Sequence, residues 1–365
     1  MKTGRVLLIL AGISGVFLLF LISLVFRAVP QPIIEIKGEA LWELGPLPIR
    51  NTLLTSWAVV LVLIVVAYFS GRSLKWLPSG WQNFVETIIE GIHNLVVGTA
   101  GEKHGRRFFW VIATFFIYVA LSNWFALLPI FNAVGKVEPV GPQEGEFREE
   151  AVIVQKAGGL SIVNFQAELV ELDVDETACE SLEGTEHDAC LEGARAEAIA
   201  EAKAEHEVGE GEELAILAPY LRSVNTDLMS TLSLAISSAI FVEYWGISTL
   251  GIFAYGSRFF NVRQLLRGKP MGVLDFFVGI LEFFAELVRL ISFTFRLFGN
   301  MLAGEILLLV MTFLLPFTFV VVGIFYGLEL FVGMIQAFIF GMLTLVFGVM
   351  AVAEHGEGHP AEEGH

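Results

Sequence analysis

The sequence predicts an all-α, polytopic membrane protein of about six membrane helices that also carries one acidic insert. Hydrophobic residues make up 55% of the 365-residue chain, and the mean hydropathy is +0.70. Charged residues make up 17%, against roughly 25% in soluble domains. The formal net charge of −17 is confined to residues 136–213, which hold 22 Asp or Glu and 5 Lys or Arg, whereas the rest of the chain holds 17 of each sign. The apolar runs are therefore free to enter a bilayer.

Six apolar runs are long enough to cross a bilayer, since about 20 helical residues suffice. They cover residues 6–26, 51–71, 108–135, 228–257, 271–316 and 317–353. The first run is either a retained helix or a signal peptide that is removed. The last two meet near Pro316 and exceed the length of an upright span, so we expect two long, tilted helices that form an antiparallel hairpin.

Positively charged residues mark the cytoplasmic loops of membrane proteins. They precede the first run and recur in the loops 72–107 and 256–269, the second of which contains no acid. We therefore expect both chain termini in the cytoplasm and the acidic insert outside the cell membrane. No stretch has the positive excess of a nucleic-acid-binding surface, so the expected partner is the lipid bilayer and not a nucleic acid.

These patterns also predict how the chain is organised, including one amphipathic segment with apolar side chains on a single helical face. The predicted parts are an extra N-terminal membrane helix or signal peptide at 1–27, membrane helices at 28–135 with an amphipathic interfacial helix at 81–97, the acidic extracytoplasmic insert at 136–226, a membrane helix and basic cytoplasmic loop at 227–270, the tilted hairpin at 271–353 and a polar cytoplasmic tail at 354–365.

The acidic insert contains the two cysteines of the chain, Cys179 and Cys190. On an oxidising side of the membrane they could form a disulfide, with two free thiols as the alternative. Residues 191–207 are rich in Ala and Glu and predict a solvated helix. We predict no metal site, because the tail histidines are better explained as part of a solvated tail. No cofactor is expected, and the chain lacks the GxxxxGK[ST] phosphate loop of a nucleotide site.

The last two apolar runs contain several ionisable and polar residues. An ionisable side chain inside a bilayer is costly and indicates function by default, although such residues can also merely hold helices together. The nearest acid on the N-terminal side of Arg296 is ten residues away, so its guanidinium needs a carboxylate from elsewhere in the fold or from another chain. The set comprises Glu282, Glu286, Arg289, Arg296, Asn300, Glu305, Glu329 and Gln336.

A chain reversal near Pro316 would bring Glu305 opposite Glu329, and Arg296 opposite Gln336. Two facing carboxylates in a low dielectric cannot both ionise easily, so such a pair can take up and release protons. Arginine stays protonated. It can therefore attract a carboxylate, force that group to release its proton, and block a direct proton leak.

Residues 296–305 read Arg-Leu-Phe-Gly-Asn-Met-Leu-Ala-Gly-Glu, and Gln336 begins the segment Gln-Ala-Phe-Ile-Phe. Both segments resemble subunit a of bacterial F-type ATP synthases. Further matches are Leu-Gly-Pro at 44–46, Pro-Ser-Gly-Trp-Gln-Asn at 78–83, Leu-Ser-Asn at 121–123 and Asp-Leu-Met-Ser-Thr at 227–231. The first 40 residues and the acidic insert lie outside the resemblance.

The resemblance implies a stationary proton-channel subunit that is not itself an enzyme, in the bacterial plasma (inner) membrane. Its partners would be the ring of c subunits, which residues 271–353 would face, the peripheral-stalk b subunits and, indirectly, the catalytic head. Arg296 corresponds to the essential arginine of the family, which faces the carboxylates of the c ring. Polar residues of the two half-channels would be Asn123, Asn300, Glu305, Glu329 and Gln336 on the access side, and Glu282 and Ser292 on the exit side.

Three departures from the family leave details open. Glu329 stands where many bacterial members have His, so a Glu–Glu pair would replace a His–Glu pair. Ala126 and Met229 stand where other members carry Asp and Asn. The coupling ion is also open, with the proton as the default and sodium as the alternative.

Two other functional classes share part of this pattern. A secondary ion-coupled transporter would also carry charges at the bilayer midplane, but it usually shows inverted repeats, and none is visible in this sequence. An intramembrane hydrolase would need a nucleophile or metal motif, and the chain contains neither GxSxG nor HExxH.

Overall fold

The computed structural model describes most of the chain from residue 40 to residue 353, and the fold follows from these residues. They are 15, 38, 40–44, 47–72, 74–76, 79–128, 134–140, 150–157, 160–163, 169–174, 177, 179, 185–206, 208–209, 212–252, 255–256, 271–314 and 319–353. The predicted first span at 6–26 (apart from residue 15), most of the basic loop at 256–269 and the predicted tail at 354–365 lie outside them.

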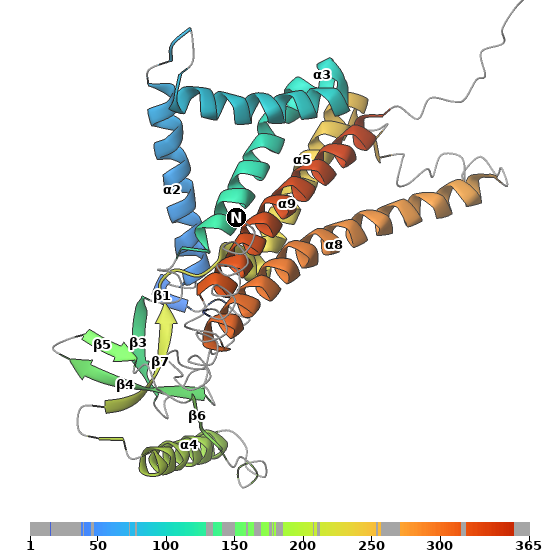
Figure 1. The fold of residues 1–365 in the computed structure, drawn as a ribbon. Helices are drawn as coiled ribbons and strands as arrows, with labels where there is room; N and C mark the ends of the chain where they lie inside the picture. The colour runs from blue at the N-terminus through green and yellow to red at the C-terminus, as the bar shows by residue number, and fades with distance from the viewer. Residues whose placement is uncertain are drawn as a thin grey trace, which may run out of the picture. The chain divides into compact units, whose positions relative to one another are not determined.

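The predicted class, a helical polytopic membrane protein, is confirmed. Within the described residues, five helices are long and apolar enough to cross a membrane. They are α2 (Asn51–Gly71), α3 (Trp81–Phe125), α5 (Leu228–Leu250), α8 (Met271–Leu314) and α9 (Phe319–Val352), all labelled in Figure 1. Helix α2 has the bounds that the sequence predicted, because Arg50 and Arg72 bracket an uninterrupted apolar run.

Helix α3 joins two predicted segments, the amphipathic helix at 81–97 and the span that begins at 108. Gly101 interrupts it with φ 74° and ψ 164°, a backbone region that glycine enters readily because it lacks a Cβ atom. The two parts of α3 consequently run in different directions (Figure 1). Gly105 permits the bend, since a Cβ atom there would lie 2.8 Å from the Cα atom of Val97.

The chain divides into two compact units. Residues 56–126, 223–301 and 331–365 form one, which we call the helix unit. Residues 1–55, 127–222 and 302–330 form the other, which we call the insert unit because it contains the acidic insert.

Aromatic packing dominates the core of the helix unit. Phe108 of α3 stacks on Trp245 of α5 with ring centroids 4.1 Å apart, and Gly348 of α9 leaves room for the same indole ring. Because lipid tails are as apolar as the side chains, close contact and not the hydrophobic effect holds membrane helices together. A polar bond adds to this contact between α5 and α9, where the hydroxyls of Ser238 and Thr344 lie 2.8 Å apart.

The acidic insert contains an antiparallel sheet that the sequence analysis did not predict. Its strand order is β3–β7–β4–β5, and β6 pairs with β4. The strands are β3 (Gly135–Pro139), β4 (Glu150–Ala157), β5 (Leu160–Val163), β6 (Leu169–Glu171) and β7 (Glu212–Pro219). Gly135 pairs with Pro219, so the first and last strands of the insert lie side by side.

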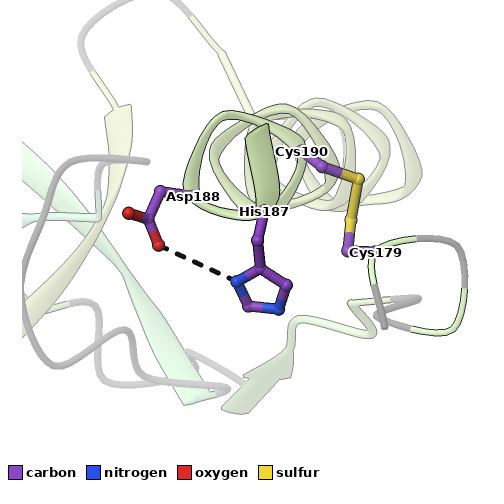
Figure 2. Close-up of a disulfide and its surroundings, with 4 residues drawn as sticks. All are labelled: Cys179, His187, Asp188 and Cys190. Atoms are coloured by element: carbon purple, nitrogen blue, oxygen red, sulfur yellow. Dashed lines mark ion pairs between the residues drawn. A yellow bond between two sulfur atoms is a disulfide. The ribbon is translucent and has the colours of Figure 1, made fainter. Parts of the chain in front are cut away.

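The predicted solvated helix of the insert is present as α4 (Thr185–Glu205), and it begins earlier than the predicted 191–207. Its Ile199 and Ala202 pack with Val170 and Leu214 from the strands. Cys190 on α4 and Cys179 form a disulfide with Cα atoms 5.7 Å apart (Figure 2). The bond attaches the start of α4 to the loop before it.

Two short strands and several buried polar groups connect the insert to the start of α2. Strands β1 (Ala40–Leu44) and β2 (Leu47–Arg50) form an antiparallel hairpin that leads directly into α2. Asn51 donates a hydrogen bond from Nδ2 to the carbonyl of Pro219 at 3.2 Å, and the backbone N–H of Arg222 donates to Thr55 Oγ1 at 3.1 Å. Asn51 and Thr55 are fully buried, so these bonds satisfy polar groups that water does not reach.

Candidate functional site

Arg296 lies on an exposed part of α8 in the helix unit. Its hydrogen-bond partner is Ser292 one turn earlier, with Nη2 3.4 Å from Oγ, which is at the long end of hydrogen-bond distances. Within the described part of the chain, no carboxylate forms an ion pair with this guanidinium. Its charge is thus available to a group from outside this chain.

The surface of α8 beside Arg296 is apolar. Side chains recur on it at the spacing of a single helical face, and each is exposed. Such a stripe would be covered by lipid or by other membrane helices. Arg296 follows its last member in sequence and lies about 100° further round the helix, at the border of the stripe. The stripe consists of Phe277, Leu281, Phe284, Val288, Ile291 and Phe295.

A hydrogen bond between amide side chains joins α8 to α9 within the helix unit. Asn300 donates from Nδ2 to Gln336 Oε1 at 2.8 Å, and Gln336 is 3% exposed. The structure thus places Asn300 opposite Gln336. The sequence predicted Arg296 in that place, but Arg296 lies one helical turn earlier on α8. Leu297, Met301 and Ala337 belong to one buried cluster beside this amide pair.

In the insert unit, the carboxylate of Glu329 on α9 lies against Gly304 on α8. A Cβ atom at Gly304 would overlap this carboxylate, and Glu305 is the next residue along α8. Glu329 is 5% exposed, and its Oε1 has no hydrogen-bond partner among the described residues. Glu329 thus lies beside the segment of α8 that carries Glu305, and the carboxylate pair stays a prediction.

For the function that the motif resemblance implies, replacing Gly304 with alanine should displace the carboxylate of Glu329 and lower proton-coupled ATP synthesis by about ten-fold, the effect of roughly 1.4 kcal/mol of lost positioning. The activity of the complex reconstituted into vesicles measures this. Gly327→Ala is the matched control, since nothing lies within 4 Å of a Cβ atom at that position of α9. Equal activity of the two variants would show that the position of Glu329 does not matter.

The remaining predicted residues lie in different surroundings. Asn123 on α3 is buried and donates from Nδ2 to the carbonyl of Gly333 on α9 at 3.0 Å. Glu282 is half-buried on α8, and Ser292 is exposed. Asn225, which the sequence analysis did not single out, donates to Asn123 Oδ1 at 2.6 Å. The sequence could have drawn attention to Asn225 in one way, because this residue lies two positions before the motif that begins at Asp227.

No group of three or more His, Cys, Asp or Glu side chains that could hold a metal ion occurs among the described residues. The polar groups on the described spans include an exposed arginine, a pair of bonded amides and a buried glutamate. This combination defines a polytopic membrane protein that carries charged and polar groups on its spans, the class in which ion pathways are found.

The comparison with protein families specifies this class further. The family model of the ATP synthase A chain matches residues 53–348, which is most of the sequence. The chain therefore belongs to the ATP synthase A chain family, and the resemblance inferred from its motifs is confirmed. It is a multi-pass membrane protein that takes part in proton transport and ATP synthesis.

Three relatives carry the printed name ATP synthase subunit a. One from Gloeobacter violaceus is 26% identical over 90% of this chain and 96% of its own length. One from Moorella thermoacetica is 23% identical over 89% of this chain and 99% of its own length. One from Trichlorobacter lovleyi is 44% identical over a shorter stretch, 22% of this chain and 35% of that relative.

Proposed function

We propose that the chain is the stationary proton-conducting subunit of a rotary ATP synthase, with two half-channels that lead protons to and from the carboxylates of a c ring. The observation that carries this proposal is the exposed Arg296 at the border of an apolar helix face, without a carboxylate partner in the described part of the chain. A cation in that setting needs an anion from another membrane subunit. A carboxylate on each c subunit has the required charge and location.

On the access side, protons would pass Glu305 and Glu329 before they reach a ring carboxylate. Glutamate side chains can take up and release a proton, whereas the amides of Asn123, Asn300 and Gln336 remain neutral and act by orienting water. The ring carboxylate then carries the proton through lipid in its neutral form, because a bare charge in the bilayer is costly.

On the exit side, Arg296 would favour the ionised form of the arriving carboxylate, since a nearby opposite charge stabilises that form. The released proton would leave past Ser292 and Glu282. Arg296 itself keeps its proton, so it prevents protons from crossing between the half-channels without turning the ring. The membrane potential supplies about 2.3 kcal/mol per charge for each 100 mV.

The chain would have no catalytic step of its own. ATP synthesis takes place in the head of the complex, and peripheral-stalk b subunits would hold this subunit still relative to that head. Rotation of the ring then couples the proton flow to the distant nucleotide sites.

We further propose that the acidic insert lies outside the plasma membrane and that both termini are cytoplasmic. The disulfide supports this topology, because such bonds persist in oxidising compartments. A membrane-impermeant amine reagent should label the exposed Lys203 of α4 in intact cells, and Lys75, exposed after α2, in inverted vesicles. The opposite labelling pattern would reverse the proposed orientation.

Purification after mild solubilisation tests the functional proposal. The tagged chain should copurify with a small, highly apolar subunit in several copies and with an ATP-hydrolysing head. A secondary transporter is the alternative outcome. In that case the chain would purify without these subunits, and vesicles containing it alone would exchange a solute in response to an ion gradient.

A further inference from the structure

A buried cluster of polar groups joins three segments of the helix unit. Asn225 lies in the short 3-10 helix η1 (Val224–Thr226) just before α5. Its Nδ2 donates to Asn123 Oδ1 at 2.6 Å, and Asn123 Nδ2 donates to the carbonyl of Gly333 at 3.0 Å. Asn225 is 0% exposed and Asn123 is 1% exposed.

Close packing fixes the orientation of both amides. A Cβ atom at Gly333 would lie 3.0 Å from the Cβ atom of Asn123, so glycine lets the two helices approach far enough for the bond. The carbonyl of Gly333 can only accept, and therefore Asn123 turns its Nδ2 toward it and its Oδ1 toward Asn225. Asn225 in turn donates a hydrogen bond from its Nδ2 to Asn123. Its own Oδ1 therefore takes no part in the bond between the two amides.

That Oδ1 atom is buried and has no hydrogen-bond partner among the described residues. The same is true of the hydroxyl oxygens of the neighbouring Ser122 and Ser223. Buried polar atoms nearly always have a protein or water partner, and buried water typically bonds to groups that would otherwise be unsatisfied. The unpartnered acceptors therefore indicate bound water at this cluster.

A second buried polar pair in the same unit lacks this property. The hydroxyls of Ser238 and Thr344 bond to each other, and Thr344 also donates to the carbonyl of Phe340. Neither side chain leaves an unpartnered buried atom among the described residues. The Ser238–Thr344 pair thus has no need of a bound water and serves as the control for the asparagine cluster.

We infer that Asn225 is a positioning residue of the access half-channel: it fixes the amide of Asn123 and holds a water molecule on its Oδ1. The inference rests on the proposed function. The amides stay neutral throughout. Each water accepts a proton from one neighbour and releases another of its protons to the next, so no net charge remains at Asn225.

Reaction of an introduced thiol with silver ion tests whether water reaches the cluster. Both native cysteines are in the disulfide, so Asn225→Cys and Ser238→Cys each add a single free thiol to the subunit. In the assembled complex in vesicles, Ag⁺ should block the thiol at 225 at least about ten-fold faster than the thiol at 238, because a thiol in dry apolar surroundings is unreactive. Quenching with a maleimide under denaturing conditions and mass spectrometry measure the rate. Equal rates, or a slower reaction at 225, would overturn the inference.

Proton flux tests whether Asn225 positions the pathway or only stabilises the fold. Asn225→Ala and Ser238→Ala each remove one buried hydrogen bond, so they should lower the thermal stability of the complex by similar amounts. Only Asn225→Ala should also lower passive proton flux, by about ten-fold, and Asn225→Ser, which keeps a polar oxygen, should restore much of it. Similar flux in both alanine variants would reject a positioning role.

These outcomes remain distinct from failure of the proposed function itself. If Arg296→Ala abolishes coupling while Asn225→Ala conducts normally, the subunit assignment stands and Asn225 is structural. If Arg296→Ala couples normally, the proposed function fails regardless of what the silver reaction shows.

Discussion

Replacing Arg296 with alanine is expected to abolish proton-coupled ATP synthesis while the complex still assembles. Without the guanidinium, a ring carboxylate that reaches the exit side would have to ionise with no opposite charge nearby. An uncompensated charge near the bilayer centre costs about 2.5–3.5 kcal/mol, so proton release should slow by on the order of 100-fold. ATP synthesis driven by an imposed proton gradient in reconstituted vesicles measures the effect.

Assembly should survive because no hydrogen bond or ion pair joins Arg296 to another helix among the described residues. It is exposed, and its hydrogen-bond partner, Ser292, is on the same helix. Copurification of the c subunits in wild-type amounts would verify this. Arg296→Lys should remain strongly impaired, since a lysine has neither the reach nor the planar, two-pronged geometry with which arginine binds a carboxylate.

Arg289 supplies a matched control two turns earlier on α8. Its guanidinium carbon lies 3.8 Å from the centre of the Phe347 ring, so this cation already has a partner within the helix unit. Arg289→Ala should therefore cost packing but leave coupled synthesis largely intact. Normal synthesis by Arg296→Ala, or an equal loss in the two variants, would contradict a special role for Arg296.

The sequence predicted the helical spans because their signal is local. A run such as 51–71, with an arginine at each end, needs no tertiary information, and α2 has those bounds. The sheet of the acidic insert was missed for the opposite reason. Strand β4 acquires its partners from β5, β6 and β7, and β7 begins 55 residues after β4 ends. The many acidic residues of this segment predicted a solvated loop, whereas its strands are stabilised by pairing with strands that are far away in the sequence.

The sequence predicted which residues belong to the candidate site, but not which of them contact each other. Ionisable residues within apolar runs identified Arg296 and the two glutamates without any structure. The pairing of Asn300 with Gln336 depends on how α8 packs on α9, and a shift of one turn cannot be read from the position of Pro316. Asn225 was missed because its bonding partner, Asn123, is more than 100 residues away in the sequence.

Glu329→Gln is expected to lower proton-coupled synthesis by about 100-fold, the lower range for loss of a group that transfers protons. It should also change the shape of the pH–rate profile. A glutamine has nearly the size of glutamate but cannot take up or release a proton, so packing against Gly304 is preserved while one titrating group is lost. Rates of ATP synthesis and of ATP-driven proton pumping across a pH series measure both effects.

Variants of Glu305 allow a stricter test than the loss of Glu329 alone. If the two carboxylates act as a unit, Glu305→Gln should cause a comparable loss, and the double variant should be far less impaired than the sum of the single effects predicts. Glu329→Asp should retain part of the activity, because it keeps a titrating group at a shorter reach. Glu243→Gln, which removes an acid from α5 outside the proposed path, is the control and should retain the wild-type profile. An unchanged pH–rate profile in Glu329→Gln would remove Glu329 from the proton path, and additive losses would mean that the two glutamates act independently.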